Sequence, residues 1–303
     1  MDRRTFFKKS LATSVTVGSY LALGKYDELL AASSTQFDLV AVKGGEPDIM
    51  FNKGIEALGG MKTFVKKGQK VVVKPNIGWD VSPERAGNTH PRLISRIIKH
   101  CLDAGAKEVY VVDHTCDEWQ RCYSNSGIER AAKDAGAKVV PGHSESYYHD
   151  VKIPGGKSLT SAKEHEVILN ADVFINVPIL KNHSGANLTI AMKNLMGNVW
   201  DRRYWHRTDL HQCIADFATF RKPDLNIVDA YYVMKSNGPR GISVEDVVTM
   251  KAQLISTDIV AIDTAAAKLF GMKPEDVRHI QIAADMKVER MDLDKLNIKR
   301  ITV

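Results

Sequence analysis

One stretch, residues 172–197, constrains the fold of this chain more than any other. It begins with an apolar run, Val173–Val177, of the length and composition of a buried strand, and Pro178 lacks the N–H that a further ladder hydrogen bond would need. A basic, amide-rich loop follows, and a helical run from Asn187 closes near Gly197. A strand that leads through a polar loop into a helix is the local unit of an open α/β sheet.

The same alternation extends over most of the chain, beginning at Phe37. Three valines precede Lys74, and a run with apolar residues at helical spacing follows Pro91. Strand-like and helix-like runs then alternate up to a final strand, Ile298–Val303. This alternation predicts an α/β fold with a mostly parallel sheet and helices on both faces, in a single large domain over residues 37–303.

The first 36 residues are expected to be a leader and not part of that domain. Asp2–Lys8 closely resembles a twin-arginine export signal, a weakly apolar run follows at Leu11–Leu23, and the small residues Ala31–Ser33 offer a cleavage site. A basic amphipathic helix is the alternative interpretation. The apolar run is shorter than the roughly 20 residues of a membrane span. We therefore expect the twin-arginine export machinery to recognise residues 1–36. We also expect a periplasmic or other extracytoplasmic location for the protein, and no stable membrane span.

The composition, 44% hydrophobic and 26% charged residues, is that of a soluble globular protein. The formal net charge of +6 is modest, and no basic run with interleaved aromatics is present, so nucleic acid is not an expected partner. Cys101, Cys116, Cys122 and Cys213 lie too far apart for a zinc or iron–sulfur spacing. Cys116 and Cys122 could form a disulfide in an oxidising periplasm, with free thiols as the default.

Polar and charged side chains follow the predicted strands at the points where those strands end. They are Lys74 and Asn76, Asp113 and His114, Asn176, Lys181 and His183, Asp229, and Asp258. Because the carboxyl ends of parallel strands share one edge of a sheet, we expect these side chains to converge on a single crevice. Each aspartate also has an alternative interpretation, which is to cap the turn or helix that follows it.

The lysines indicate the chemistry of that crevice. Lys74 and Lys181 emerge from buried strand ends beside asparagine and histidine, where an anion is their natural partner. Lys193 on the following helix would add a contact, although a lysine near a helix C-terminus also matches the helix dipole. We predict a small anionic ligand, a carboxylate or phosphate, as the substrate. The predicted substrate-binding residues are Lys74, Asn76, Lys181, Asn182, Lys193, Asn194 and Asp229.

Proton transfer would fall to His183 or His211, with Asp113 or Asp229 to orient the imidazole or bind a metal. In a second hypothesis, the chain is a metal- or redox-linked accessory protein in which Asp113, His114, His183 and His211 bind a divalent metal. The cofactor stays unidentified. The chain has no His-Glu-x-x-His, no phosphate-binding loop ending in Gly-Lys-Ser/Thr and no Gly-x-Ser-x-Gly. Those absences argue against peptidase, nucleoside-triphosphatase and serine-hydrolase functions, and whether the protein is an enzyme stays open.

Several of these residues carry a resemblance to a known family. They are Val73–Asn76, Asn176–His183, Lys193–Gly197, His211, Asp229 and Gly238–Gly241. In these motifs, over about residues 38–290, the chain resembles the bacterial and archaeal family called domain of unknown function 362. The resemblance implies an α/β domain, often exported or joined to a ferredoxin-like module with two iron–sulfur clusters, and no established reaction. This chain has no Cys-x-x-Cys-x-x-Cys run, so cluster binding is not expected. The arrangement is also faintly similar to the nucleotide-binding half of lactate-racemase-like proteins.

Overall fold

A mostly parallel sheet of ten strands organises residues 37–303, the part of the chain that the computed structural model describes. Its strands are β1 (Leu39–Lys43), β2 (Lys70–Pro75), β3 (Glu108–Val111), β4 (Lys138–Val139), β7 (Val173–Val177), β8 (Ile179–His183), β9 (Asn187–Thr189), β10 (Leu225–Met234), β11 (Val247–Ser256) and β12 (Ile298–Thr302). Their order is β12-β1-β11-β10-β7-β2-β3-β4, with β8 paired to β10 and β9 paired to β8. The α/β alternation in the sequence therefore predicted the fold class.

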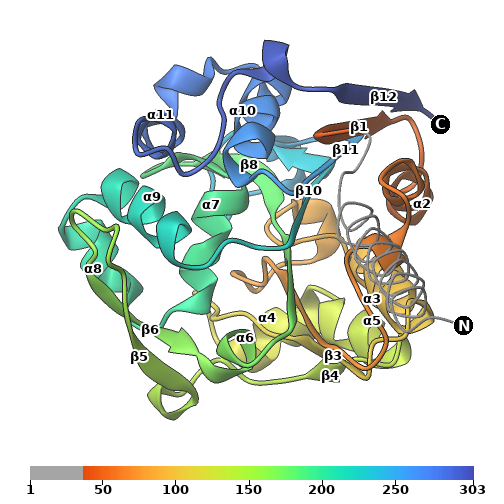
Figure 1. The fold of residues 1–303 in the computed structure, drawn as a ribbon, viewed down its shortest axis with the longest axis horizontal. Helices are drawn as coiled ribbons and strands as arrows, with labels where there is room; N and C mark the ends of the chain where they lie inside the picture. Colours follow the sequence, from red (N-terminus) through yellow and green to blue (C-terminus); the bar gives the residue numbers. More distant parts are fainter. Residues whose placement is uncertain (1–36) are drawn as a thin grey trace, which may run out of the picture. The chain divides into compact units, whose positions relative to one another are not determined.

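Helices cover both faces of this sheet (Figure 1). Over one face lie α2 (Pro47–Ala57), α3 (Pro91–Asp103), α4 (Trp119–Asn125) and α5 (Ile128–Asp134). Over the other lie α6 (Glu166–Leu169), α7 (Ala191–Asn194), α8 (Arg202–Arg207), α9 (Leu210–Phe220), α10 (Ile259–Phe270) and α11 (Arg278–Asp285). Each face has its own hydrophobic core, so β2 and β7 are buried on both sides. This double burial explains why their sequences are nearly continuous in apolar residues.

The helix α3 shows how the sequence determines one of these elements. Leu93, Ile94, Ile97 and Ile98 are fully buried on one side of the helix, which is the spacing that predicted it. Before Pro91, at the first helical position, the imidazole of His90 accepts a hydrogen bond from the backbone N–H of Arg92 (3.2 Å). The helix thus begins at the predicted place and packs beneath β2.

The segment that follows Pro178 differs from the prediction. We expected a polar loop and then a helix from Asn187, but the chain resumes as β8, turns, and returns as the antiparallel strand β9. Asn187 has φ = +63°, a left-handed conformation that an α-helix does not use. The helix is reduced to α7 and continues as one 3-10 turn, η4 (Leu195–Asn198). Because apolar residues in this segment are buried all round, their spacing could not distinguish strand from helix.

At two strands, β10 and β11, the carboxyl end also lies elsewhere than the sequence predicted. β10 does not end at Val228 but continues to Met234, so Asp229 lies inside a strand. β11 runs antiparallel to β10, with Ser256 paired to Asn226 near the start of β10. Its carboxyl end therefore points to the opposite edge of the sheet from the parallel strands. Asp258, which follows β11, caps α10 by accepting hydrogen bonds from the N–H groups of that helix's first turn.

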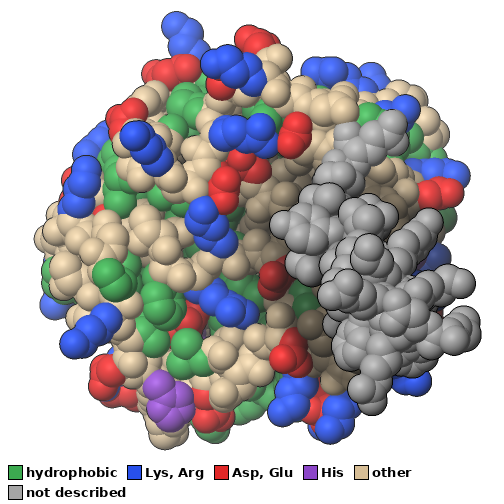
Figure 2. Space-filling model, in the orientation of Figure 1, with side chains coloured by type: hydrophobic (Ala, Val, Ile, Leu, Met, Phe, Trp, Pro, Cys, Tyr) green, Lys and Arg blue, Asp and Glu red, His purple; other side chains and the backbone are tan. Residues whose placement is uncertain are grey.

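Residues 143–166 contain a separate two-stranded hairpin, β5 (Tyr148–Lys152) and β6 (Ser161–His165). On the face seen in Figure 2, lysine and arginine side chains are interspersed with aspartate and glutamate and do not gather in one patch. Among the described helices, none is long and apolar enough to cross a membrane. The predicted leader, residues 1–36, lies outside the described residues.

Candidate functional site

A small cavity of about 60 Å³, here called the inner cavity, lies where β2, β3 and β8 meet the α7–η4 segment. Seven predicted site residues line it: Lys74, Asn76, Asp113, Lys181, His183, Lys193 and Asn194. They come from four separate parts of the chain, and sheet topology places them together. Nine other residues share the wall, including Trp79, Cys116 and Arg202.

The floor of the inner cavity is an ion pair. The Lys74 ammonium lies 2.8 Å from the Asp113 carboxylate, and both side chains are buried. Lys74 also donates to the backbone oxygen of Asn194 (2.7 Å) and to its side-chain oxygen (3.1 Å). The second oxygen of Asp113 accepts the backbone N–H of Ile77 (2.6 Å). Burial lowers the pKa of Lys74, while the charge of Asp113 opposes that shift. The hydrogen bonds of Lys74 are thus directed at the protein itself.

Gly197 closes the space directly above this ion pair. A Cβ atom at Gly197 would lie 1.8 Å from the Asp113 carboxylate and 2.5 Å from the Lys74 nitrogen. Both distances are far shorter than any real contact, so only a residue without a side chain allows the backbone to approach so closely. The backbone oxygen of Gly197 in turn accepts the N–H of His114 (3.1 Å), which links η4 to the end of β3.

Four asparagines form a hydrogen-bonded row behind the cavity, here called the asparagine row. The side-chain nitrogen of Asn76 donates to the side-chain oxygen of Asn194 (3.1 Å), and the nitrogen of Asn194 donates to Asn176 (2.9 Å). The nitrogen of Asn176 then donates to Asn226 (3.0 Å). The row crosses from β2 through α7 and β7 to β10, so it holds α7 against the sheet at the level of the site.

Two other lysines supply the charge of the inner cavity. Lys181 is 1% exposed, donates to the backbone oxygen of Gly87 (2.6 Å), and lies 5.9 Å from the centre of the Trp79 ring. Burial lowers its pKa to about 7. Burial also lowers the pKa of Lys193 to about 8, and the positive charge of Arg202 contributes. Because desolvation disfavours both ammonium groups, a bound anion would favour their charged forms.

His183 is held as a neutral hydrogen-bond donor. Its Nδ1 accepts the backbone N–H groups of Gly185 (3.0 Å) and Ala186 (3.1 Å), so the ring proton resides on Nε2. Burial, followed by the charges of Lys193 and Lys181, lowers the pKa of His183 to about 2. In this state the imidazole can donate one hydrogen bond from Nε2, and Nδ1 has no free lone pair with which to accept a proton.

Three predicted site residues do not line the inner cavity. His211 lies on α9, where its Nδ1 is 3.3 Å from the Nδ1 of His279 on α11. The side chain of Asn182 accepts the N–H of Gly238 (3.0 Å). The Asp229 carboxylate accepts the N–H groups of His90 (2.7 Å) and Tyr231 (3.0 Å). Asn182 and Asp229 thus fix backbone segments, and Asp229, inside β10, does so at the residue before α3 and not at an element that follows it.

The metal-ligand set of the second hypothesis is not assembled. No group of three or more His, Cys, Asp or Glu side chains arranged to hold a metal ion occurs within residues 37–303. Asp113, His114 and His183 line the inner cavity but His211 does not. The imidazole of His114 shares a hydrogen bond with the backbone oxygen of Val199 (2.9 Å). Cys116 and Cys122 are free thiols, the first exposed and the second buried.

Sequence reasoning missed three residues of the wall: Trp79, Cys116 and Arg202. Arg202 donates to the backbone oxygens of His114 (2.8 Å) and Thr115 (2.6 Å), and lies 3.6 Å from the Cys116 sulfur. It therefore holds the loop after β3 in place beside the cavity. The signal that could have found it is the basic and aromatic run at residues 200–207, directly after the site stretch.

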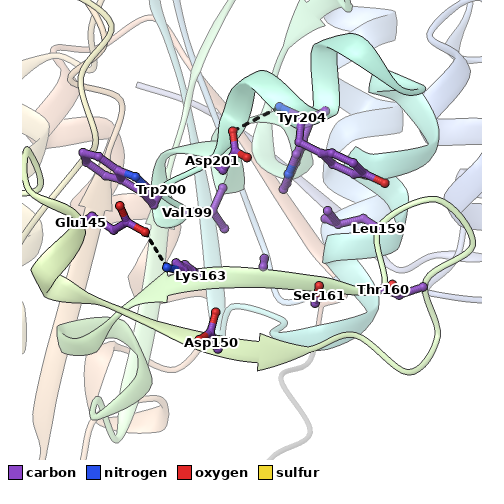
Figure 3. A pocket seen from close by; sticks show the side chains of 12 residues that line it. Glu145, Asp150, Leu159, Thr160, Ser161, Lys163, Val199, Trp200, Asp201 and Tyr204 are labelled. Atoms are coloured by element: carbon purple, nitrogen blue, oxygen red, sulfur yellow. Dashed lines mark hydrogen bonds and ion pairs between the residues drawn. The ribbon is translucent and has the colours of Figure 1, made fainter.

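Two larger cavities lie nearby. One of about 770 Å³, here called the outer cavity, shares part of its wall with the inner cavity. The other, of about 610 Å³, lies between the β5–β6 hairpin and residues 199–205 (Figure 3). Among the described residues, Glu145, Asp150 and Asp201 line the latter against one lysine, Lys163, which pairs with Glu145 (2.5 Å). Because its carboxylates outnumber its lysine, this third cavity is a poor place for an anion.

These features define an α/β protein with an open sheet and a cation-lined cavity at the carboxyl edge of its parallel strands. The family model described as "Domain of unknown function (DUF362)" matches residues 71–268, about two thirds of the chain, so the chain belongs to that family. The thylakoid-associated protein sll1697 of Synechocystis sp. is 26% identical over 231 residues, which is 74% of this chain and 70% of that relative.

Two solved structures are also similar. One is the lactate racemase apoprotein from Thermoanaerobacterium thermosaccharolyticum, with a TM-score of 0.39, 11% identity and coverage of 70% of this chain. The second is a structural-genomics protein from Thermotoga maritima, with a TM-score of 0.35, 11% identity and coverage of 61% of this chain. The match spans about half of each of those proteins, 53% and 51%.

Proposed function

We propose that this protein binds, and acts on, a small molecule through a carboxylate or phosphate group that enters the inner cavity. In this proposal Lys181 and Lys193 hold the anion, and His183 donates a hydrogen bond from Nε2. Lys74 shapes the floor through its pair with Asp113. The edge of the sheet at which this cavity lies is the one where open α/β sheets bind ligands.

The proposal rests on one observation: cationic side chains outnumber carboxylates in the wall of a small cavity. Four cationic side chains line a cavity of about 60 Å³, and Asp113 is the one carboxylate that residues 37–303 contribute to its wall. Lys74 neutralises that carboxylate, which leaves Lys181, Lys193 and Arg202 without an acidic partner in the wall. A buried ammonium is costly unless it is paired, so an anion is the guest that this wall favours.

Lys181 is also the group that we propose for proton transfer. In the empty cavity the pKa of Lys181 is about 7, and a bound anion favours its ammonium form, so in the complex Lys181 has a proton to deliver as a general acid. His183 is less suited to that task, because its Nδ1 is occupied and its pKa is about 2.

The test of the binding site is Lys181→Met, which keeps the length of the side chain and removes the charge. Loss of a charge-assisted hydrogen bond should weaken inorganic phosphate or acetate binding by about tenfold or more at pH 6.5. Calorimetric titration measures this affinity. Lys99→Met on the exposed side of α3 is the matched control and should bind as the unmodified protein does. Equal affinity in both variants would remove Lys181 from the site.

Cys116 provides a second readout. It lines both the inner and outer cavities and is exposed, whereas Cys101, Cys122 and Cys213 are buried. Neutral iodoacetamide should therefore modify it first. Saturating phosphate should slow that modification in the unmodified protein and not in Lys181→Met. An unchanged rate in the unmodified protein would place bound phosphate elsewhere.

We further propose that the protein reaches an extracytoplasmic compartment by the twin-arginine route. Arg3 and Arg4, within the sequence pattern of such a signal, support the proposal. Replacing both with lysine should retain the protein in the cytoplasm, as cell fractionation measures. Export that persists in this double variant would contradict the proposed route.

A further inference from the structure

We infer that the ligand has two parts, an anionic head in the inner cavity and a flat, aromatic body in the outer cavity. This inference rests on the proposed function and adds the class of molecule to which the anionic group is attached. It follows from the sizes of the two cavities, from the way they join, and from the different side chains that line them.

The inner cavity accommodates a head group and little more. A single buried water needs about 10–15 Å³ of cavity volume. The inner cavity of about 60 Å³ therefore corresponds to only a few water positions, which suits one carboxylate or phosphate group. Lys74, Asn76, Asp113 and Asn194 line it and do not line the outer cavity. The deep end is thus polar throughout, and an organic body has no favourable contact there.

The outer cavity is of the size and character that an organic body requires. Its volume of about 770 Å³ falls within the range of about 300–1,000 Å³ that is typical of sites for small organic ligands. Four apolar side chains line it: Trp79, Met196, Trp200 and Pro239. Indole rings and a thioether favour flat, polarisable partners. Three of these four, Trp79, Met196 and Pro239, also line the inner cavity, and charged side chains line the outer cavity as well: Lys193, Asp201, Arg202 and Arg203. Because Lys74, Asn76, Asp113 and Asn194 line the inner cavity alone and Trp200 lines the outer one alone, a matching ligand is amphipathic.

The two cavities have eight lining residues in common, which places them side by side, and in this inference one molecule extends from the first into the second. Trp79, His183 and Lys193 are among the residues that line the two spaces together. The Trp79 ring centre lies 5.9 Å from the Lys181 nitrogen. An anion held by Lys181 therefore brings whatever is attached to it against the indole of Trp79. A ring stacked there continues toward Trp200, which lines the outer cavity and not the inner one.

The experiment compares head groups alone with the same head groups on a ring. The probes are inorganic phosphate, pyrophosphate and 2-naphthyl phosphate, with acetate and 2-naphthoate as the carboxylate series. We expect the naphthyl compound to bind about tenfold tighter than its bare head group, because aromatic contact and apolar burial add to the head's affinity. Calorimetry on the full chain measures each affinity at one pH and one salt concentration.

Substitutions of single tryptophans test which residues provide the tenfold gain in affinity. Trp200→Leu should remove most of the tenfold advantage and leave inorganic phosphate binding within about twofold. Trp79→Leu should act in the same direction. Trp119→Leu is the control, because Trp119 stacks on His143 with ring centres 4.5 Å apart and lines neither cavity. It should leave both affinities unchanged.

Two results would overturn the inference while leaving the proposed function intact. The first is equal affinity for phosphate and 2-naphthyl phosphate. The second is pyrophosphate that binds tighter than 2-naphthyl phosphate and is insensitive to Trp200→Leu, which would assign the outer cavity to a second anionic group. By contrast, phosphate and acetate affinities that do not change in Lys181→Met would defeat the proposed function itself.

Discussion

Gly197 shows how strictly a single position in this site is constrained. Its backbone passes so close to the Lys74–Asp113 ion pair that a Cβ atom would lie 1.8 Å from a carboxylate oxygen. In the sequence, Gly197 is typical of the end of a helix, which needs only a flexible backbone. The close approach depends on side chains from β2 and β3, and no local pattern reveals such a contact.

Gly197→Ala should therefore destabilise the protein by about 1–3 kcal/mol or more, because the added methyl group must displace one member of the ion pair. Gly185→Ala is the matched control, since a Cβ at Gly185 meets its nearest neighbours at 3.5 Å, an ordinary contact. That change should stay within about 0.5 kcal/mol. Urea unfolding measures both variants. Equal stability of the two would show that the ion pair can move aside freely.

At the scale of elements, the sequence identified most strands and helices but not the path through the site. Strand and helix order follows from apolar periodicity, and α3 begins at Pro91 as predicted. The hairpin β8–β9 was missed because its apolar residues are buried on every side. Asp229 was misplaced because β10 continues for five further residues, which are also mostly apolar. Trp79, Cys116 and Arg202 reach the cavity from loops and a short helix, whose placement depends on the assembled fold.

The helix α7 is too short to be stable alone and depends on a neighbouring helix. Asp263 of α10 is fully buried and accepts the N–H groups of Ala191 (2.7 Å) and Met192 (3.1 Å) at the start of α7. Burial raises the pKa of this carboxyl to about 8, an effect that those two hydrogen bonds oppose. Asp263 therefore acts as an N-terminal cap provided by another element.

Asp263→Ala should cost about 1–3 kcal/mol, because two buried N–H groups lose their acceptor. It should also weaken phosphate binding, since α7 carries Lys193. Asp263→Asn keeps one acceptor oxygen but turns an NH2 donor toward the other N–H, so it should restore only part of each loss. The control is Asp285→Ala on α11, where the carboxylate accepts only a side-chain hydrogen bond from Gln281 at the surface. Thermal melts and phosphate titrations measure the set, and a stable Asp263→Ala variant would contradict the capping role.

At the scale of the whole molecule, the buried lysines connect pH with stability and with binding. The pKa of Lys181 is about 7 in the folded protein and about 10.5 in an unfolded chain. Between these values the unfolded chain holds a proton that the folded protein lacks. The contribution of Lys181 to the free energy of unfolding therefore rises as pH rises through this window. Anion binding has the opposite dependence, because it requires the protonated ammonium.

Rising pH should thus stabilise the empty protein relative to Lys181→Met and weaken its ligand binding at the same time. From pH 7 to 9 the stability difference between the two proteins should shift in favour of the unmodified one by up to about 1 kcal/mol per pH unit. Sulfate, whose charge is constant over this range, should bind more weakly as pH rises. Thermal melts and sulfate titrations measure the two trends. If the stability difference and the sulfate affinity both rise, or both fall, as pH rises, Lys181 is not their common cause.

The asparagine row has one further consequence. A carboxamide donates hydrogen bonds only through its nitrogen, so the row has a direction. Two contacts fix that direction: the Lys74 ammonium donates to the side-chain oxygen of Asn194, and the side-chain nitrogen of Asn176 donates to the backbone oxygen of Ala191. Its nitrogen terminus, Asn226, stays within the sheet, and its oxygen terminus, Asn76, reaches the cavity with no hydrogen-bond donor among the described residues. Because that oxygen is buried, a guest in the cavity leaves its lone pair unsatisfied unless the wall moves.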